Sequence, residues 1–93
     1  MTNLEYLLVL KNQLEGEIKE TKSRIQYKEE CIKILDELIE KEQQNCEGGI
    51  GLAYLSDLRE RSKKEMDILK PRIQYRQERI KILDELIRKE QQI

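Results

Sequence analysis

The chain has 93 residues and a formal net charge of −1, 40% of its residues are charged, and it contains no His, Phe or Trp. This length allows one domain, 1–93, and the composition is typical of long charged helices rather than of a globule with a thick core. It excludes the common metal-binding and nucleophilic constellations that depend on histidine. We therefore expect no enzyme activity, no cofactor and no metal site.

The chain also lacks the features of a membrane or secreted protein. No apolar run approaches the roughly 18 residues of a membrane-spanning helix. The opening segment, 1–11, has an acidic flank where a signal peptide needs a basic one. We expect a cytoplasmic protein with no membrane contact.

The first predicted element is one long helix over about residues 3–45. Its isoleucines at 18, 25, 32 and 39 are spaced by seven, and the same frame extends back to Leu4. This heptad pattern is typical of a coiled-coil-like helix, which would be roughly 64 Å long at 1.5 Å per residue. Thr2 followed by Glu5 indicates a capping box at its start.

A turn is predicted over residues 46–51, which contain the chain's only glycine cluster. Glycine supplies the backbone angles with which helices end and turn, so the chain is expected to reverse there. The second helix is predicted to begin at Leu52 and to run to the C-terminus. Cys31 and Cys46 lie too far apart along one helix to form a disulfide, so Cys46 would be a spectator thiol or form an intermolecular disulfide on oxidation.

Pro71 leaves two architectures open. A proline inside a helix costs about 3 kcal/mol, so it marks either a kink in one long helix or a true break. Its counterpart Ser23 opens a second candidate capping box, which would give four short helices in a bundle or solenoid. Neither 20–24 nor 67–72 contains the Gly or Asn that helix–helix turns usually use. Two long helices are therefore favoured.

The two halves of the chain have similar sequences. Residues 23–44 are identical to residues 71–92 at 17 of 22 positions, and we call two positions that this alignment matches equivalent. The likeness indicates a tandem duplication, with repeat 1 at 1–48 and repeat 2 at 49–93. Repeat 1 has seven basic and eleven acidic residues and repeat 2 has eleven and eight, giving −4 and +3. The difference favours pairing of unlike copies, or it reflects drift on a solvated surface.

The heptad predicts which side chains pack. Positions a and d would form the seam, and a second apolar stripe lies at positions c and g. A helix with apolar a, d and g positions can contact two neighbours, so the favoured assembly is a dimer in which two antiparallel all-α hairpins form a four-helix bundle. The predicted oligomer interface comprises Leu4, Leu7, Ile18, Ile25, Ile32, Leu35, Ile39, Met66, Ile73, Ile80, Leu83 and Ile87. The c and g stripe comprises Tyr6, Leu10, Tyr27, Cys31, Ile34 and Leu38, with Tyr54, Leu58, Tyr75, Ile82 and Leu86.

These patterns predict a structural or protein-interaction module that self-associates. The stripe would alternatively dock onto another helical protein. A further alternative is nucleic-acid binding, because Arg72, Tyr75, Arg76 and Arg79 share one side of the second helix, and guanidinium groups with a tyrosine suit phosphates and bases. Such a dimer is similar, in architecture only, to the small RNA-binding bundle Rop. The basic row would otherwise pair with acids of the first copy, such as Glu15, Glu17 and Glu29, and the tyrosines would pack at the edge of the bundle.

Overall fold

The chain folds into two α-helices that pack against each other. The computed structural model describes residues 2–44 and 49–92. Helix α1 spans Asn3–Gln44 and helix α2 spans Gly49–Gln91, and the described residues contain no strand. The all-α prediction and the prediction of two long helices are confirmed.

The start of α1 and its passage through the middle of the chain follow from local hydrogen bonds. The Glu5 amide donates to the Thr2 hydroxyl at 3.2 Å, as expected of a helix cap. The Ser23 hydroxyl donates to the Lys19 carbonyl at 3.1 Å, one turn back within the same helix. Ser23 is therefore an interior residue of α1 and not a cap.

Helix α2 likewise continues through Pro71. The alternative of four short helices is wrong. Pro71 removes one backbone hydrogen bond, but it is exposed, and the half-buried seam residues Leu69 and Ile73 on either side of it keep packing.

The predicted start of the second helix was placed too late. Helix α2 begins at Gly49 rather than Leu52, so Gly49–Gly51 form its first turn. Glycines are compatible with a first helical turn as well as with a turn between helices, and the amides of a first helical turn need no partner within the helix. The glycine cluster therefore does not keep the helix from starting at Gly49. The remainder of the predicted turn, 46–48, lies outside the described residues, and so does the prediction made for Cys46.

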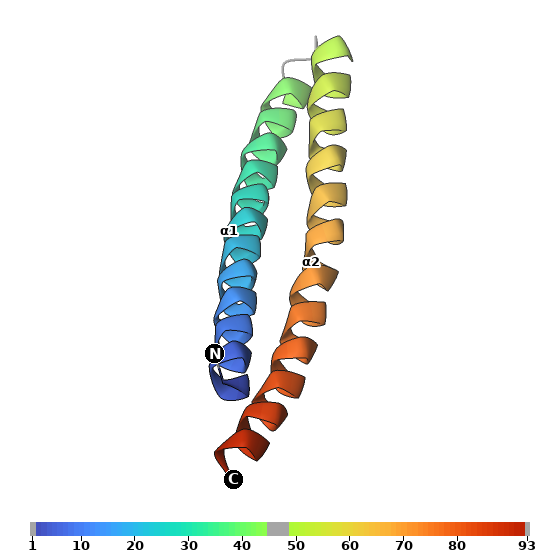
Figure 1. The fold of residues 1–93 in the computed structure, drawn as a ribbon. Coiled ribbons are helices and arrows are strands. Elements are labelled where there is room, and N and C mark those ends of the chain that lie inside the picture. The colour runs from blue at the N-terminus through green and yellow to red at the C-terminus, as the bar shows by residue number, and fades with distance from the viewer. Residues whose placement is uncertain (1, 45–48, 93) are drawn as a thin grey trace. The chain divides into compact units, whose positions relative to one another are not determined.

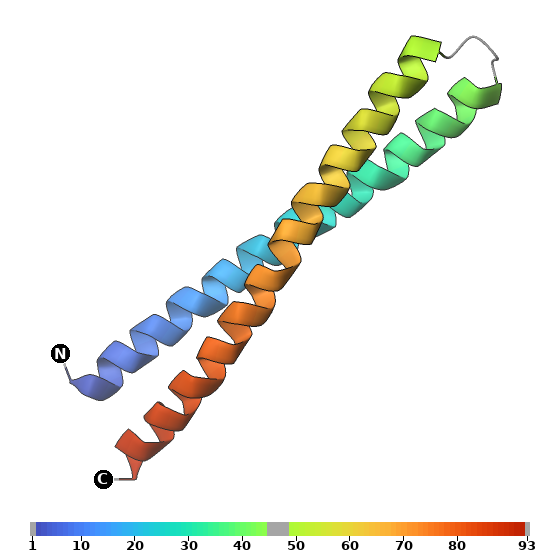
Figure 2. The same ribbon diagram turned by 90° about the vertical axis from the view of Figure 1, so that its right-hand side faces the viewer.

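The contacts divide the chain into two compact units. Unit 1 comprises Met1–Ser23 with Lys70–Ile93, and unit 2 comprises Arg24–Leu69. In unit 1 the blue part of α1 runs beside the orange and red part of α2 in the opposite direction, and in unit 2 the green part of α1 does the same beside the yellow part of α2 (Figures 1 and 2). Each unit is therefore an antiparallel helix pair.

The heptad positions a and d form the least exposed side of both helices. Among the described residues, Ile18, Ile25 and Ile87 at a positions are the buried apolar residues, and Thr21 at a d position is buried with them. The other nine residues of the predicted interface are half-buried. This pattern indicates that the a and d sides of α1 and α2 face each other within each unit. The prediction that the same residues join separate chains stays a prediction.

Candidate interaction surfaces

Two ion pairs link the helices in unit 1. The Lys11 ammonium lies 2.7 Å from the Asp84 carboxylate. The Nε–H of Arg76 donates to a Glu17 carboxylate oxygen at 2.8 Å. Lys11 and Arg76 are charged members of the mostly apolar seam, so the pairs satisfy charges that the helix packing half-buries.

Two further pairs link the helices in unit 2. Lys28 pairs with Glu65, and Arg59 pairs with Asp36. Lys28 and Arg59 occupy seam positions, as Lys11 and Arg76 do. In all four pairs the acid lies at an e or g position of the facing helix, beside its seam. Their side chains are 27% and 30% exposed, so water partly screens these interactions.

The pairs of unit 2 lie at the positions equivalent to those of unit 1. Each basic residue has a basic counterpart in the other half of the chain, and its acidic partner has an acidic one. The two sets of equivalent pairs are Lys11–Asp84 with Arg59–Asp36, and Arg76–Glu17 with Lys28–Glu65. Both units are thus held in the same antiparallel register by the same kinds of contact.

The ion pairs shift two lysine pKa values. A hydrogen bond to Asp84 raises the pKa of Lys11 above 10.5, and a hydrogen bond to Glu65 does the same for Lys28. Partial desolvation opposes the rise in both cases, and the nearby carboxylate charges add to it. Both ammonium groups therefore stay charged throughout the neutral pH range.

The c and g stripes of the two helices lie on one face of each unit. The ion pairs Arg76–Glu17 and Lys28–Glu65 each join a d position to a g position of the facing helix. The g side of one helix is therefore beside the g side of the other, as antiparallel packing requires. We call this two-helix surface, made of the c and g positions, the c/g face.

The c/g face holds most of the exposed large apolar side chains. Eight of them occur as four pairs at equivalent positions, and each is 42–64% exposed. These pairs are Tyr6 with Tyr54, Tyr27 with Tyr75, Ile34 with Ile82, and Leu38 with Leu86. All four tyrosines of the chain are among them.

The exposed apolar residues outside these pairs behave differently. Leu8, Val9 and Ile68 are also exposed, but the equivalent positions in the other half hold Ser56, Asp57 and Glu20. Among the described residues, the large exposed apolar side chains that recur at equivalent positions therefore all lie on the c/g face, although Ile68, itself at a c position, corresponds to Glu20.

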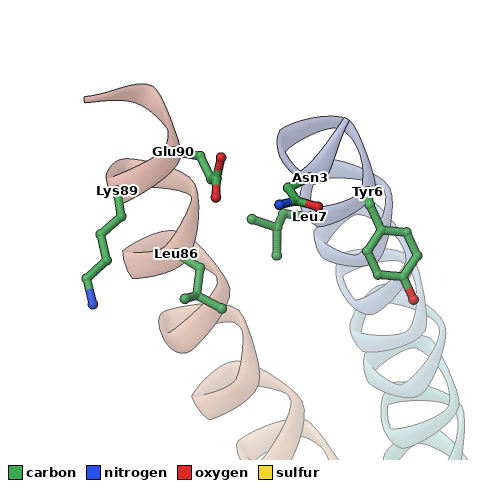
Figure 3. A pocket seen from close by; sticks show the side chains of 6 residues that line it. All are labelled: Asn3, Tyr6, Leu7, Leu86, Lys89 and Glu90. Atoms are coloured by element: carbon green, nitrogen blue, oxygen red, sulfur yellow. The ribbon is translucent and has the colours of Figure 1, made fainter. Parts of the chain in front are cut away.

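Two shallow grooves open onto the c/g face of unit 1. One, of about 300 Å³, is lined by Asn3, Tyr6, Leu7, Leu86, Lys89 and Glu90. Figure 3 shows Leu7 and Glu90 pointing toward the facing helix, whereas Tyr6 and Lys89 point outward. All six residues occupy c, d or g positions and come from both helices, which agrees with a single shared face.

The second groove, of about 430 Å³, contains most of the predicted nucleic-acid contacts. It is lined by Leu14, Glu17, Pro71, Arg72, Tyr75 and Arg76. The guanidinium group of the fourth predicted residue, Arg79, lies 4.6 Å from the centre of the Tyr75 ring. The structure thus brings the predicted row together. It also pairs Arg76, one of the three arginines of the row, with Glu17, one of the three acids that the alternative prediction named.

Charge is distributed unequally around the helices. In the part of the chain that the structure describes, c and g positions carry six basic and three acidic residues, whereas b, e and f positions carry eight basic and thirteen acidic residues. The six basic residues are Arg24, Lys41, Arg61, Arg72, Arg79 and Lys89. The pKa of Arg61 is raised by its hydrogen bonds to Asp57 on the same helix. The c/g face is therefore basic as well as apolar, and part of its charge is already neutralised.

Sequence reasoning missed the partners of the polar seam residues. It did not connect the basic seam residues Lys11, Lys28 and Arg76 with Asp84, Glu65 and Glu17 as a set. The sequence contained a signal for these ion pairs. A basic residue at a or d in one helix and an acid at e or g in the other recur together at equivalent positions of the two halves.

The remaining candidate groups are few. Cys31 is a half-buried free thiol. Among the described residues no group of three or more His, Cys, Asp or Glu side chains is placed to hold a metal ion. Within the same residues no helix combines the length and apolar character needed to cross a bilayer.

These features define an all-α protein whose two helices pack against each other in antiparallel units. A scan against protein-family models finds no match to this chain, and searches of the curated proteins and of the solved structures likewise find none. The function of this protein is therefore inferred from the chemistry of the a/d seam and of the c/g face.

Proposed function

We propose that this protein is a non-enzymatic, structural protein-interaction module that self-associates. Two chains pack their c/g faces together and form a four-helix bundle. In this proposal the two halves of the chain arose by tandem duplication, and each unit pairs part of one repeat with part of the other. The seam within each unit forms the helix pair, and the c/g face joins one pair to the next.

The observation that carries the proposal is the set of exposed apolar side chains at equivalent positions in both halves. The exposed residues Leu8 and Val9, by contrast, have the polar residues Ser56 and Asp57 at their equivalent positions. Side chains that stay large and apolar in both halves while remaining about half exposed indicate a surface that is covered in the assembled state.

The energetics of burial are sufficient for a dimer. Burying the exposed half of one such side chain contributes about 1 kcal/mol. Eight side chains from each of the two chains would then supply about 16 kcal/mol, compared with about 4–15 kcal/mol for the lost freedom of association. A second copy supplies a face with the same apolar content, and the half-buried a and d residues would become more buried in a four-helix core.

Sedimentation equilibrium tests this proposal. The wild-type protein should have about twice the chain mass of 11.2 kDa. The double variant L38E/L86E should sediment as a monomer and stay helical by circular dichroism, since it leaves the a and d seam intact. The matched control is Q26E/Q74E, which places the same charges at exposed b positions and should remain a dimer. A wild-type protein that sediments with the mass of one chain would contradict self-association and leave another helical protein as the partner.

A second candidate function is nucleic-acid binding, which the basic character of the c/g face favours. Arg72 and Tyr75 line one groove, and Arg79 lies over the Tyr75 ring. This arrangement offers guanidinium groups for phosphates and an aromatic ring for a base. The ion pair of Arg76 with Glu17 and the net charge of −1 weigh against it. A gel-shift series with single-stranded oligonucleotides at low salt should show binding that R72Q/R79Q removes, and no shift would exclude this candidate.

A further inference from the structure

We infer that the two chains of the dimer pack with unit 1 of one chain on unit 2 of its partner. This inference rests on the proposed self-association through the c/g face. It specifies which part of a second copy each unit recognises, and thereby the direction of the two chains in the bundle.

The apolar side chains alone do not choose this orientation. The c/g face of each unit presents two tyrosines, one isoleucine and one leucine that are largely exposed at equivalent positions. The set is Tyr6, Tyr75, Ile82 and Leu86 in unit 1, and Tyr54, Tyr27, Ile34 and Leu38 in unit 2. Packing like units together or unlike units together therefore buries the same side chains. The choice must come from residues that differ between the two halves.

The largest such difference is in charge. Unit 1 has ten basic and eight acidic residues, a formal charge of +2, whereas unit 2 has eight basic and eleven acidic residues, a formal charge of −3. Packing like units together places +2 against +2 and −3 against −3. Packing unlike units together pairs a net charge of +2 with one of −3 in each contact, although most of the acidic residues of unit 2 lie outside the c/g face. Electrostatic complementarity of this kind sets orientation and register more than it sets affinity.

The charges on the c/g face itself point in the same direction. Among the described residues the c and g positions carry +1 in unit 1 and +2 in unit 2. Repulsion grows with the product of the two charges that meet. Pairing a +1 face with a +2 face in both contacts therefore gives less total repulsion than pairing each face with its own kind. Screening over about 10 Å at 0.1 M salt limits the preference, so it should be strongest at low ionic strength.

A distance measurement between spin labels distinguishes the orientations. Glu85→Cys, in a background with Cys31→Ser and Cys46→Ser, places one label on the exposed f side of unit 1. Glu85 lies about 15 residues from the boundary of its unit, so labels on the two chains should be about 45 Å apart along the helices when unlike units pack. When like units pack, both labels lie at one end of a bundle with helices about 10 Å apart, and their separation should be below about 30 Å.

The outcomes separate this inference from the proposed function. A dimer by sedimentation with the longer label separation supports both. A dimer with the shorter label separation overturns the inference and leaves self-association standing. A monomer by sedimentation overturns the proposed function itself. Labelling at Glu37→Cys, the equivalent position in unit 2, should give the same distance as Glu85→Cys.

The role of charge is tested by exchanging two equivalent residues. Glu40 and Arg88 occupy equivalent positions, are exposed, and lie outside the c/g face. The double variant E40R/R88E keeps the composition but changes unit 1 to neutral and unit 2 to −1. The short-distance population should then grow at low salt. A distance distribution identical to that of the unexchanged protein would show that unit charge does not set the orientation.

Discussion

Reversing the charge of Arg76 tests whether the interhelical ion pairs hold the two helices in register. Arg76 donates to Glu17 at 2.8 Å, and the two side chains are 25% and 40% exposed. Partly exposed pairs of this kind contribute roughly 0.2–1 kcal/mol, and a like-charge pair costs a similar amount. Arg76→Glu loses the attraction and adds a repulsion, so it should reduce the free energy of unfolding by about 0.5–2 kcal/mol.

The second substitution in this cycle is Glu17→Arg, which restores opposite charges in the reversed order. The double variant E17R/R76E should recover to within about 0.5 kcal/mol of the wild-type free energy of unfolding. Urea unfolding followed by circular dichroism measures all three, at one protein concentration because self-association adds to apparent stability. The equivalent cycle with K28E and E65K should behave alike in unit 2. A double variant as unstable as R76E, or one whose loss is the sum of the single losses, would refute the pair.

Three further predictions concern the helices themselves. Gly16 is a helix-interior glycine, and a Cβ added there would meet no atom within 4 Å. Gly16→Ala should therefore raise the free energy of unfolding by about 0.5–1 kcal/mol, measured as a higher urea midpoint, and an unchanged midpoint contradicts this. Pro71 lies inside α2, so Pro71→Ala should stabilise by on the order of 1–3 kcal/mol, and a loss of stability would mean that the helix needs the proline. The pKa of Lys28 is raised by Glu65, so its stabilising contribution is complete below pH 10.5 and is lost as the pH rises through the raised value. Lys28→Gln should therefore weaken the alkaline decline in stability measured by thermal melting, and an unchanged decline would exclude Lys28 as a source.

The helices and the seam were largely predictable from the sequence because both depend on local spacing. A seven-residue repeat of apolar residues defines one side of a helix wherever that side is buried, and Ile18, Ile25 and Ile87 are the buried residues that it identified. The start of α2 was less predictable, because Gly49 and Gly51 are compatible both with a turn and with a first helical turn.

The candidate surfaces were only half predictable for a different physical reason. The basic row from Arg72 to Arg79 follows from spacing on one helix, and the structure places it together. Glu17, which occupies Arg76, comes from the other helix, and its height beside Arg76 depends on how far one helix is shifted along the other. Spacing within one helix does not contain that shift.

The ion pairs also show which property of the seam the two halves share. At both pairs of equivalent contacts the basic residue differs, Lys11 against Arg59 and Lys28 against Arg76. Both acids are identical in the two halves. Lysine and arginine share a positive charge but differ in hydrogen-bonding geometry, so the register requires the charge and not one particular donor group. Outside the pairs, Glu29, Cys31 and Glu40 correspond to Gln77, Arg79 and Arg88, and each difference makes the second half of the chain more positive. The halves therefore agree where charge sets the register of each helix pair and differ where, in our proposal, it sets the orientation of one chain on another.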